Sequence, residues 1–267
     1  MKADDPVVVA ASTAGGKWIS EECPHLPATP DALVDDVVAS VRAGAVMAHL
    51  HARDELGQPT FDPDVMEYIV RRVRAGCDAL VQVSTGNLPG EPAESLPAFL
   101  GSRPEFASFN LKDEPDKARE RAEIFRRLGV RPVIEAFDVS MIRMAGEFLM
   151  EGQLPAPLIF ELVFELEAAE RGPIDTTADV LDRVRAVEEI GDAFWSVTRG
   201  AAHRGLTHAL ALGLGGWIRV GMEDSLVSLD GSVVRSSAEL VDEALTLVRA
   251  LGRRPARYAE ARTLLRL

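Results

Sequence analysis

The feature that most constrains the fold of this chain is a regular alternation of short β-rich runs with longer amphipathic segments. Eight of these runs are predicted to form strands, at residues 6–12, 44–51, 79–84, 106–111, 131–137, 157–164, 193–197 and 216–220. A segment with helical spacing of apolar residues follows each run. Eight strands that each lead into a helix favour a parallel sheet, and at 267 residues the expected architecture is a closed (β/α)8, or TIM, barrel.

A doubly wound open sheet is the alternative α/β architecture. It is less favoured because residues 12–17, after the first strand, lack the GxGxxG spacing of a dinucleotide-binding turn. No Pro/Ser-rich linker and no shift in composition divides the sequence. We therefore expect a single barrel domain that spans residues 1–267.

Charge and hydropathy exclude several classes of partner. Lys and Arg number 29 against 42 Asp and Glu, and the net charge of -13 repels polyanions such as nucleic acids. No apolar run approaches the roughly 20 residues of a membrane helix, and the acidic residues 1–5 do not resemble a signal peptide, so a cytoplasmic protein is expected. Cys23 and Cys77 lack CxxC spacing and are expected to be reduced thiols.

Two histidines lie at the end of the second predicted strand. His49 and His51 are two residues apart, and this spacing places both imidazoles on one face of a strand. Glu223 follows the eighth strand, which neighbours the first strand in a barrel, so it can reach the same point. The three side chains would form a His2Glu metal site with an open position, and zinc is the metal expected there. The alternative is one histidine with a backbone partner and one on the rim.

Three further charged residues are predicted at strand ends. Arg219 ends the eighth strand and Asp224 follows it, so the two side chains form either an ion pair at the barrel mouth or a base held by an arginine. Glu135 ends the fifth strand, where an inward-facing acid needs a partner. Arg219 is the candidate partner, in a catalytic arrangement or in a plain buried salt bridge.

The loop after the third strand offers polar groups for a ligand. Ser84, Thr85 and Gly86 supply hydroxyl and backbone donors that suit a carboxylate or a phosphate. An ordinary turn is the alternative interpretation.

Several short motifs occur along the chain: HLHARD at 49–54, STG at 84–86, EAFD at 135–138, WSV at 195–197 and LGGWIRVGMED at 214–224. Together these motifs resemble the β-keto acid cleavage enzymes, the family of 3-keto-5-aminohexanoate cleavage enzyme. The resemblance covers essentially the whole chain, and the motifs occur in the family's order.

The resemblance implies a zinc-dependent (β/α)8 acyltransferase, usually a homotetramer, that converts a β-keto acid and acetyl-CoA into acetoacetate and a new acyl-CoA. By the family's motifs, His49, His51 and Glu223 would hold zinc. Arg219 and Asp224 would form the base, and Ser84 would help to place the substrate. Zinc would then act as a Lewis acid on the developing enolate.

The sequence departs from the family around the substrate. Residues 13–17, after the first strand, contain no acid where many members have one, which argues against a cationic substrate side chain. Asn110, in an unusual run after the fourth strand, is a further candidate for substrate contact. Arg199 and Arg204, after the seventh strand, are the candidates for binding the phosphates of CoA.

Two other functions are compatible with the same residues. The first is a metal-dependent hydrolase of a small carboxylic acid, whose zinc would activate water. That class usually takes further metal ligands from later strands, and His203 and His208, on a predicted helix, are poorly placed to supply them. The second is a catalytically idle barrel that binds a small acid.

Overall fold

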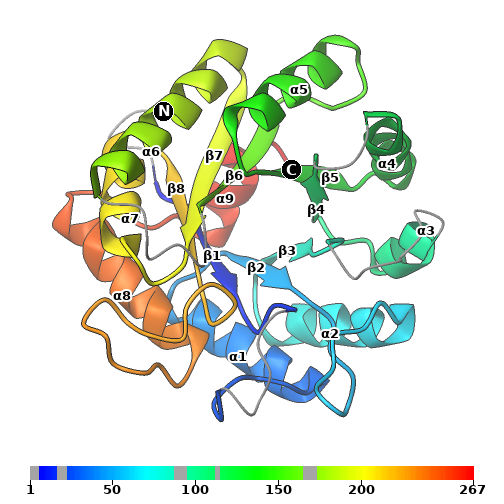
Figure 1. Cartoon of the computed structure of the whole chain (residues 1–267). Helices are drawn as coiled ribbons and strands as arrows, with labels where there is room; N and C mark the ends of the chain where they lie inside the picture. Colours follow the sequence, from blue (N-terminus) through cyan, green and yellow to red (C-terminus); the bar gives the residue numbers. More distant parts are fainter. Residues whose placement is uncertain (1–5, 17–22, 87–94, 112–114, 165–172) are drawn as a thin grey trace.

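The computed structural model describes residues 6–16, 23–86, 95–111, 115–164 and 173–267, and these form a closed barrel of eight parallel strands (Figure 1). Neighbouring strands pair in sequence order, and β1 also pairs with β8, which closes the sheet. The predicted (β/α)8 fold is therefore confirmed. The strands are β1 (Val9–Ser12), β2 (Met47–Leu50), β3 (Leu80–Val83), β4 (Phe106–Asn110), β5 (Arg131–Ala136), β6 (Leu158–Phe164), β7 (Ala193–Arg199) and β8 (Trp217–Val220).

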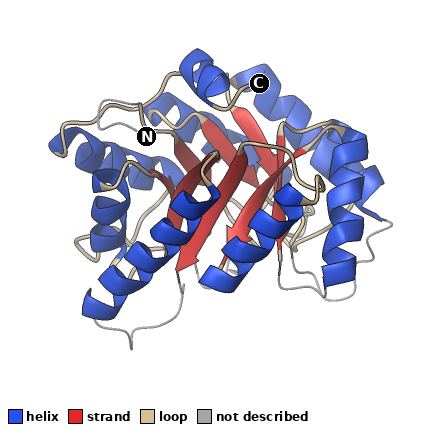
Figure 2. Cartoon of the chain, turned by 90° about the horizontal axis from the view of Figure 1, so that it is seen from above, coloured by secondary structure: helices blue, strands red, loops and turns tan. Residues whose placement is uncertain are grey.

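Helices surround the strands, as the view in Figure 2 shows. They are α1 (Pro30–Ala43), α2 (Pro63–Gly76), α3 (Leu96–Phe99), α4 (Pro115–Leu128), α5 (Val139–Met150), α6 (Pro173–Ile190), α7 (Arg204–Gly213), α8 (Ser237–Ala250) and α9 (Tyr258–Leu264), with a 3-10 turn, η2 (Leu100–Ser102), after α3. Side chains cap two of these helices: that of Thr29, before α1, accepts a hydrogen bond from the amide of Ala32, and that of Asp62, before α2, accepts one from the amide of Asp64. None of the helices within these described ranges is long and apolar enough to cross a membrane.

Several elements differ from the sequence prediction; β1 and β2, for example, each begin three residues later than predicted, at Val9 and Met47. Strand β7 continues to Arg199 instead of ending at Val197, because Leu162, Val163 and Phe164 of β6 pair with its last three residues. Helix α9 was not predicted at all. It follows Ala256, whose amide bonds to the carbonyl of Val7, so the end of the chain packs beside the start of β1. The sequence also predicts a short helix over residues 93–100; the structure has α3 at Leu96–Phe99, with Leu100 in η2, and residues 93 and 94 lie outside the described ranges.

The strand register places polar residues in one layer near the carboxyl ends of the strands. Ser12 pairs with His49, and His49 with Gln82, across β1, β2 and β3. On the other side of the barrel the paired row is Asn110, Glu135, Glu161 and Ser196, from β4 to β7. Register partners on parallel strands point to the same face of the sheet. The two rows therefore bring polar side chains together inside the barrel, above an apolar core.

Candidate active site

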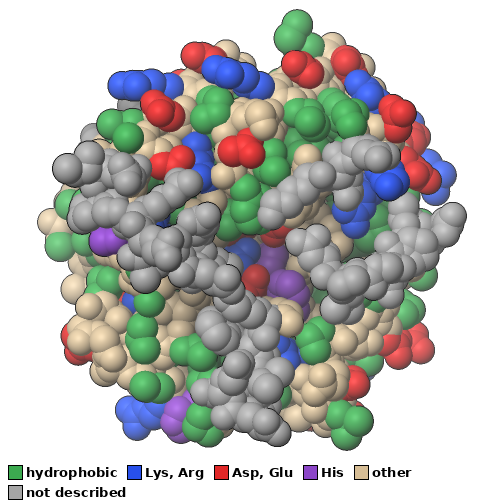
Figure 3. All heavy atoms as spheres, in the orientation of Figure 1, with side chains coloured by type: hydrophobic (Ala, Val, Ile, Leu, Met, Phe, Trp, Pro, Cys, Tyr) green, Lys and Arg blue, Asp and Glu red, His purple; other side chains and the backbone are tan. Residues whose placement is uncertain are grey.

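A cavity of about 400 Å³ opens among the loops that follow the strands. Figure 3 shows histidine and acidic side chains at the bottom of a hollow in the centre of this face. Barrel enzymes place their active sites at the carboxyl ends of the strands, and this cavity has that position. Its described lining includes His51, Ser84, Gly86, Glu135, Arg219, Glu223, Asp224, Thr60, Phe61, Phe99, Phe137, Val163 and Thr198.

His49, His51 and Glu223 converge on one point, as the sequence predicts. The Nε2 atoms of the two histidines lie 3.2 Å apart. Nε2 of His49 is 3.5 Å from Oε2 of Glu223, and Nε2 of His51 is 3.3 Å from Oε1. One ligand atom from each residue lies within 4.8 Å of the others, so the group could hold a metal ion.

The charges of these side chains suit that role. Burial, together with the nearby Arg219, holds the pKa of His49 well below its usual value, so its imidazole is neutral. Burial opposes ionisation of Glu223, but the positive charge of Arg219, with a smaller contribution from its hydrogen bond with His51, outweighs burial and holds the pKa of this carboxyl well below its usual range. Neutral imidazoles and an ionised carboxylate are the donors that a divalent metal requires.

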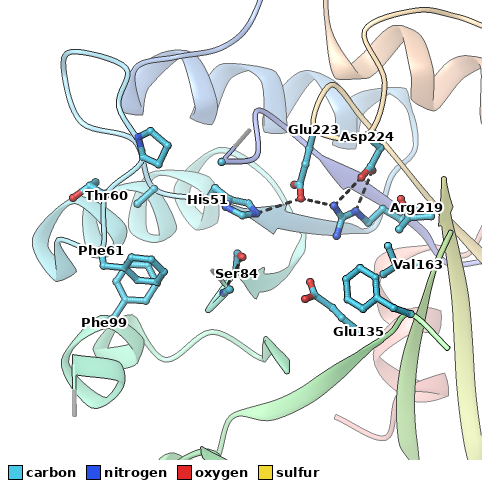
Figure 4. A pocket seen from close by; sticks show the side chains of 16 residues that line it. His51, Thr60, Phe61, Ser84, Phe99, Glu135, Val163, Arg219, Glu223 and Asp224 are labelled. Carbon is cyan, nitrogen blue, oxygen red and sulfur yellow. Dashed lines mark hydrogen bonds and ion pairs between the residues drawn. The ribbon is translucent and has the colours of Figure 1, made fainter. Parts of the chain in front are cut away.

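Arg219 is buried at the end of β8 and binds Asp224 through two parallel hydrogen bonds. Its Nε lies 3.1 Å from Oδ2 of Asp224, and its Nη2 lies 2.9 Å from Oδ1. Nη2 also contacts Oε1 of Glu223 (Figure 4). The guanidinium of Arg219 therefore contacts both Glu223, one of the three potential metal ligands, and the adjacent Asp224. The hydroxyl of Ser12, at the end of β1, donates a further hydrogen bond to Oδ2 of Asp224.

Asp224 is the candidate general base of this site. Burial raises its pKa above the usual value, while Arg219 and the hydroxyl of Ser12 oppose this rise. A raised pKa makes a carboxylate a stronger proton acceptor. Asp224 also lines the cavity, where a substrate can reach it.

Close packing between β1 and the turn after β8 positions Glu223 and Asp224. A Cβ at Gly221 would lie 1.6 Å from the carbonyl oxygen of Ser12, so only glycine fits there. A Cβ at Gly15 would lie 2.4 Å from Cγ of Glu223. The fully buried Arg53 donates hydrogen bonds to the carbonyls of Ala14, Gly15 and Gly57, and so holds the loop after β1 against Glu223.

The structure divides Glu135, predicted to be catalytic, and the predicted substrate residues into two groups. Ser84, Gly86 and Glu135 line the cavity. Thr85 is buried behind it, where its hydroxyl donates to the carbonyl of Ser108 at 2.6 Å. Asn110 is also buried, in register with Glu135, and is not part of the described lining.

Arg199 and Arg204, predicted to bind CoA, are both buried. Nε of Arg199 donates to the carbonyl of Ala202 at 2.6 Å. Arg204 donates to the carbonyl of Val227 at 3.0 Å and to Oε2 of Glu243 at 2.8 Å. These contacts tie the start of α7 to the loop before α8, and a role of either arginine in CoA binding stays a prediction.

The cavity has an apolar end, formed by aromatic residues that the sequence analysis did not single out. The rings of Phe61 and Phe99 lie 4.8 Å apart, centre to centre. Figure 4 shows them on the other side of His51 from Arg219 and Asp224. This end of the cavity can hold an uncharged part of a ligand while its polar end contacts charged groups.

Sequence reasoning missed two polar residues of the site, Ser12 and Glu161. Glu161 lies in β6, and its Oε1 is 3.1 Å from Nη1 of Arg219. The signal for it was present, because Glu161 is the one charged residue of an otherwise apolar strand, LIFELVF. Ser12 carried no such signal, since a serine at the end of a strand is common.

Comparisons with known proteins place relatives alongside nearly the whole chain. The profile of the family described as beta-keto acid cleavage enzyme matches residues 6–267. A 3-keto-5-aminohexanoate cleavage enzyme of Fusobacterium nucleatum is 28% identical over 276 residues, which cover 98% of each chain. A 3-oxoadipate:acetyl-CoA acetyltransferase of Cupriavidus necator is 28% identical over 274 residues, which cover 98% of this chain and 95% of that one.

Among solved structures, the binary complex of ObcA with oxaloacetate has the same fold. It superposes with a TM-score of 0.74 at 22% identity, over 90% of this chain and 67% of that chain. At this identity the likeness supports the barrel fold alone.

Proposed function

This chain belongs to the β-keto acid cleavage enzyme family, and we propose that it is a metal-dependent acyltransferase that converts a β-keto acid and acetyl-CoA into acetoacetate and a new acyl-CoA. The observation that carries the proposal is the meeting of two groups in one cavity. His49, His51 and Glu223 form a potential metal site, and Asp224 lies beside it, held by Arg219. A metal next to a base is the arrangement that abstraction of a proton α to a carbonyl requires.

His49, His51 and Glu223 fit a divalent metal by their donor set. The two Nε2 atoms face each other at 3.2 Å, and both lie near an ionised carboxylate. Two neutral imidazoles and one carboxylate are a common ligand set for catalytic zinc, so we propose zinc as the ion. When bound, it would supply Lewis acidity to the keto oxygen of the substrate.

Asp224 is proposed to take the proton from the carbon between the keto group and the carboxylate. Arg219 and Ser12 fix its carboxylate at the cavity wall, so the base is oriented before the substrate arrives. Ser84 and Glu135 line the same cavity, and we propose that they orient the β-keto acid. Thr85 and Gly86 would support this loop, and Asn110 would support Glu135 from the neighbouring strand.

Acetyl-CoA is the proposed second substrate. The name of the Cupriavidus necator relative includes acetyl-CoA, and that relative covers nearly all of this chain. Binding of CoA phosphates by Arg199 and Arg204, assembly into a homotetramer and a cytoplasmic location all stay predictions.

The hydrolase alternative gains no support from the described residues. Within the ranges that the structure describes, three or more potential metal ligands come together only at His49, His51 and Glu223. His208 is buried in α7, where its pKa is lowered to about 3, and it does not join this group.

The first experiment screens a panel of β-keto acids with acetyl-CoA and detects acetoacetate and acyl-CoA products by mass spectrometry. The panel should include acids with apolar, cationic and carboxylate substituents. At least one acid is expected to give both products in equal amounts. If keto acids or thioesters are only hydrolysed, the transferase proposal is wrong and the hydrolase is favoured.

Two substitutions then separate the metal from the base. Asp224→Asn should keep the metal and lower kcat by about 10²–10⁴, the usual loss on removal of a general base. Glu223→Gln should lower metal content and activity together, because it removes one of three ligands. Glu123→Gln, in an exposed ion pair on α4, is the matched control for loss of a carboxylate. Near-normal turnover by Asp224→Asn would move the role of base to another group, with Glu135 the next to test.

A further inference from the structure

Glu161 is a buried carboxylate in the middle of the barrel. Glu161 is only 1% exposed, and the residues on either side of it in β6, Phe160 and Leu162, are fully buried. A carboxylate taken out of water is costly to bury unless it is paired and hydrogen-bonded. Its partner is Arg219 of β8, the next strand but one, with Nη1 at 3.1 Å from Oε1 and 3.2 Å from Oε2 of Glu161.

Arg219 uses opposite edges of its guanidinium for different partners. The edge formed by Nε and Nη2 faces Asp224, and Nη2 also contacts Glu223. Nη1, on the remaining side, faces Glu161. A guanidinium is flat and rigid, but a flexible chain of methylene groups carries it. Contacts on one side alone would leave the plane free to tilt, whereas a partner on Nη1 fixes the plane.

We propose that Glu161 is a positioning residue for the reaction: its carboxyl oxygen holds Nη1 of Arg219, so that Nε and Nη2 keep Asp224 aimed into the cavity. The inference rests on the proposed function, because it assigns a role in proton abstraction. It concerns a residue that touches the arginine and is not among the residues that line the cavity.

The role requires an oxygen at the right place and does not require a negative charge. Burial raises the pKa of Glu161 to about 8, against the opposing effect of Arg219, and the nearby carboxylates Glu135, Asp224 and Glu223 contribute to the rise. A neutral carboxyl group still has a carbonyl oxygen that accepts a hydrogen bond from Nη1. The position of the acceptor and its charge can therefore be tested separately.

Two conservative substitutions make this separation. Glu161→Gln keeps the length of the side chain and an acceptor oxygen but removes the charge. Glu161→Asp keeps the charge but is one methylene shorter, so its oxygens withdraw by about 1.5 Å from Nη1. Glu123→Asp, in the exposed pair with Arg126, is the matched control for shortening an acid.

The readouts are kcat, KM for the keto acid and metal content. Glu161→Gln should keep kcat within about 3-fold of the wild-type value. Glu161→Asp should lower kcat by about 10- to 100-fold, since a misplacement of about 1 Å in a site can cost that much. For both variants KM should change less than about 3-fold, and metal content should stay at the wild-type level. Wild-type kcat in Glu161→Asp would overturn the proposal, as would a loss in Glu161→Gln equal to that in Glu161→Asp.

Crystal structures of the two variants test the inference even if the wild-type protein transfers no acyl group. In Glu161→Gln, Nε and Nη2 of Arg219 should both stay within hydrogen-bond distance of Asp224. In Glu161→Asp, at least one of these bonds should be lost. An unchanged Arg219 in Glu161→Asp would refute the positioning role, whereas an inactive wild-type protein with a displaced Arg219 in this variant would refute only the proposed function.

Discussion

His208 should give the folded barrel a pH dependence that one substitution can isolate. The side chain lies in α7 and is only 2% exposed. Burial, and secondarily the positive charge of Arg204, lowers the pKa of His208 from 6.5 to about 3. In the unfolded chain the same imidazole has its ordinary pKa of about 6.5.

The sign of the effect follows from proton uptake. Between about pH 3 and pH 6.5 the unfolded chain binds a proton at His208 that the folded protein does not bind. The free energy of unfolding therefore falls as the pH is lowered through this window, and the contribution is fully present above it. With these two pKa values, His208 alone should lower the free energy of unfolding by about 2 kcal/mol between pH 7 and pH 5.

The assay is urea unfolding at pH 7 and pH 5, followed by tryptophan fluorescence, for the wild-type protein and for His208→Gln. Other titrating groups contribute equally to both proteins, so the quantity of interest is the difference between their pH dependences. The wild-type protein should lose about 2 kcal/mol more than the variant. Parallel losses in the two proteins would show that His208 is protonated in the folded state or is not buried there, and would refute the reasoning.

Two other predictions concern Arg53 and the metal. Arg53→Met should lower the free energy of unfolding by about 3 kcal/mol, because buried carbonyls of the loops after β1 and β2 lose a charged donor. Arg53→Met should also reduce metal content, because Arg53 bonds to the carbonyl of Gly15, and Gly15 packs on Glu223. The control in thermal unfolding is Arg254→Met, which removes an arginine from an exposed ion pair. Removal of metal by a chelator should lower the unfolding temperature of the wild-type protein but not of Glu223→Gln. Added zinc at about 100 times its Kd should restore about 2.7 kcal/mol, and equal responses of the two proteins would exclude this metal site.

The fold could be predicted because the alternation of strands and helices recurs eight times, the length suits a closed barrel, and residues 12–17 lack the dinucleotide-binding turn typical of an open doubly wound sheet. The boundaries were less predictable where tertiary pairing sets them. Strand β7 reaches Arg199 because β6 is long enough to pair with it, and this is not visible in the sequence of β7 alone. Helix α9 is short, and its place beside the start of β1 depends on contacts with residues at the other end of the chain.

The candidate site was predictable where strand ends alone determine proximity. The three potential metal ligands meet because a single strand, β1, lies between β2, which carries His49 and leads to His51, and β8, which leads to Glu223. Glu161 stands in the same relation to Arg219, because a single strand, β7, lies between β6 and β8. It was missed because it lies in the middle of β6 and not at its end, and the height of such a side chain in the barrel depends on strand tilt and stagger, which the sequence pattern does not show. Arg53 was noticed only as part of a motif, and its hydrogen bonds to two loops became visible in the structure.

The pairing of β1 with β8, which closes the barrel, also determines when the site can assemble during folding. Ser12 and Asp224, which bond across it, are 212 residues apart in sequence. Contacts of such long sequence separation form late, after the loop-closure entropy of the intervening chain has been overcome. A folding intermediate that lacks the eighth strand retains His49 and His51 but has neither Glu223 nor the arginine beside it. Uptake of a metal during refolding would therefore report closure of the barrel. The rate of metal uptake could be compared with the rate of tryptophan burial to show whether barrel closure is the last step of folding.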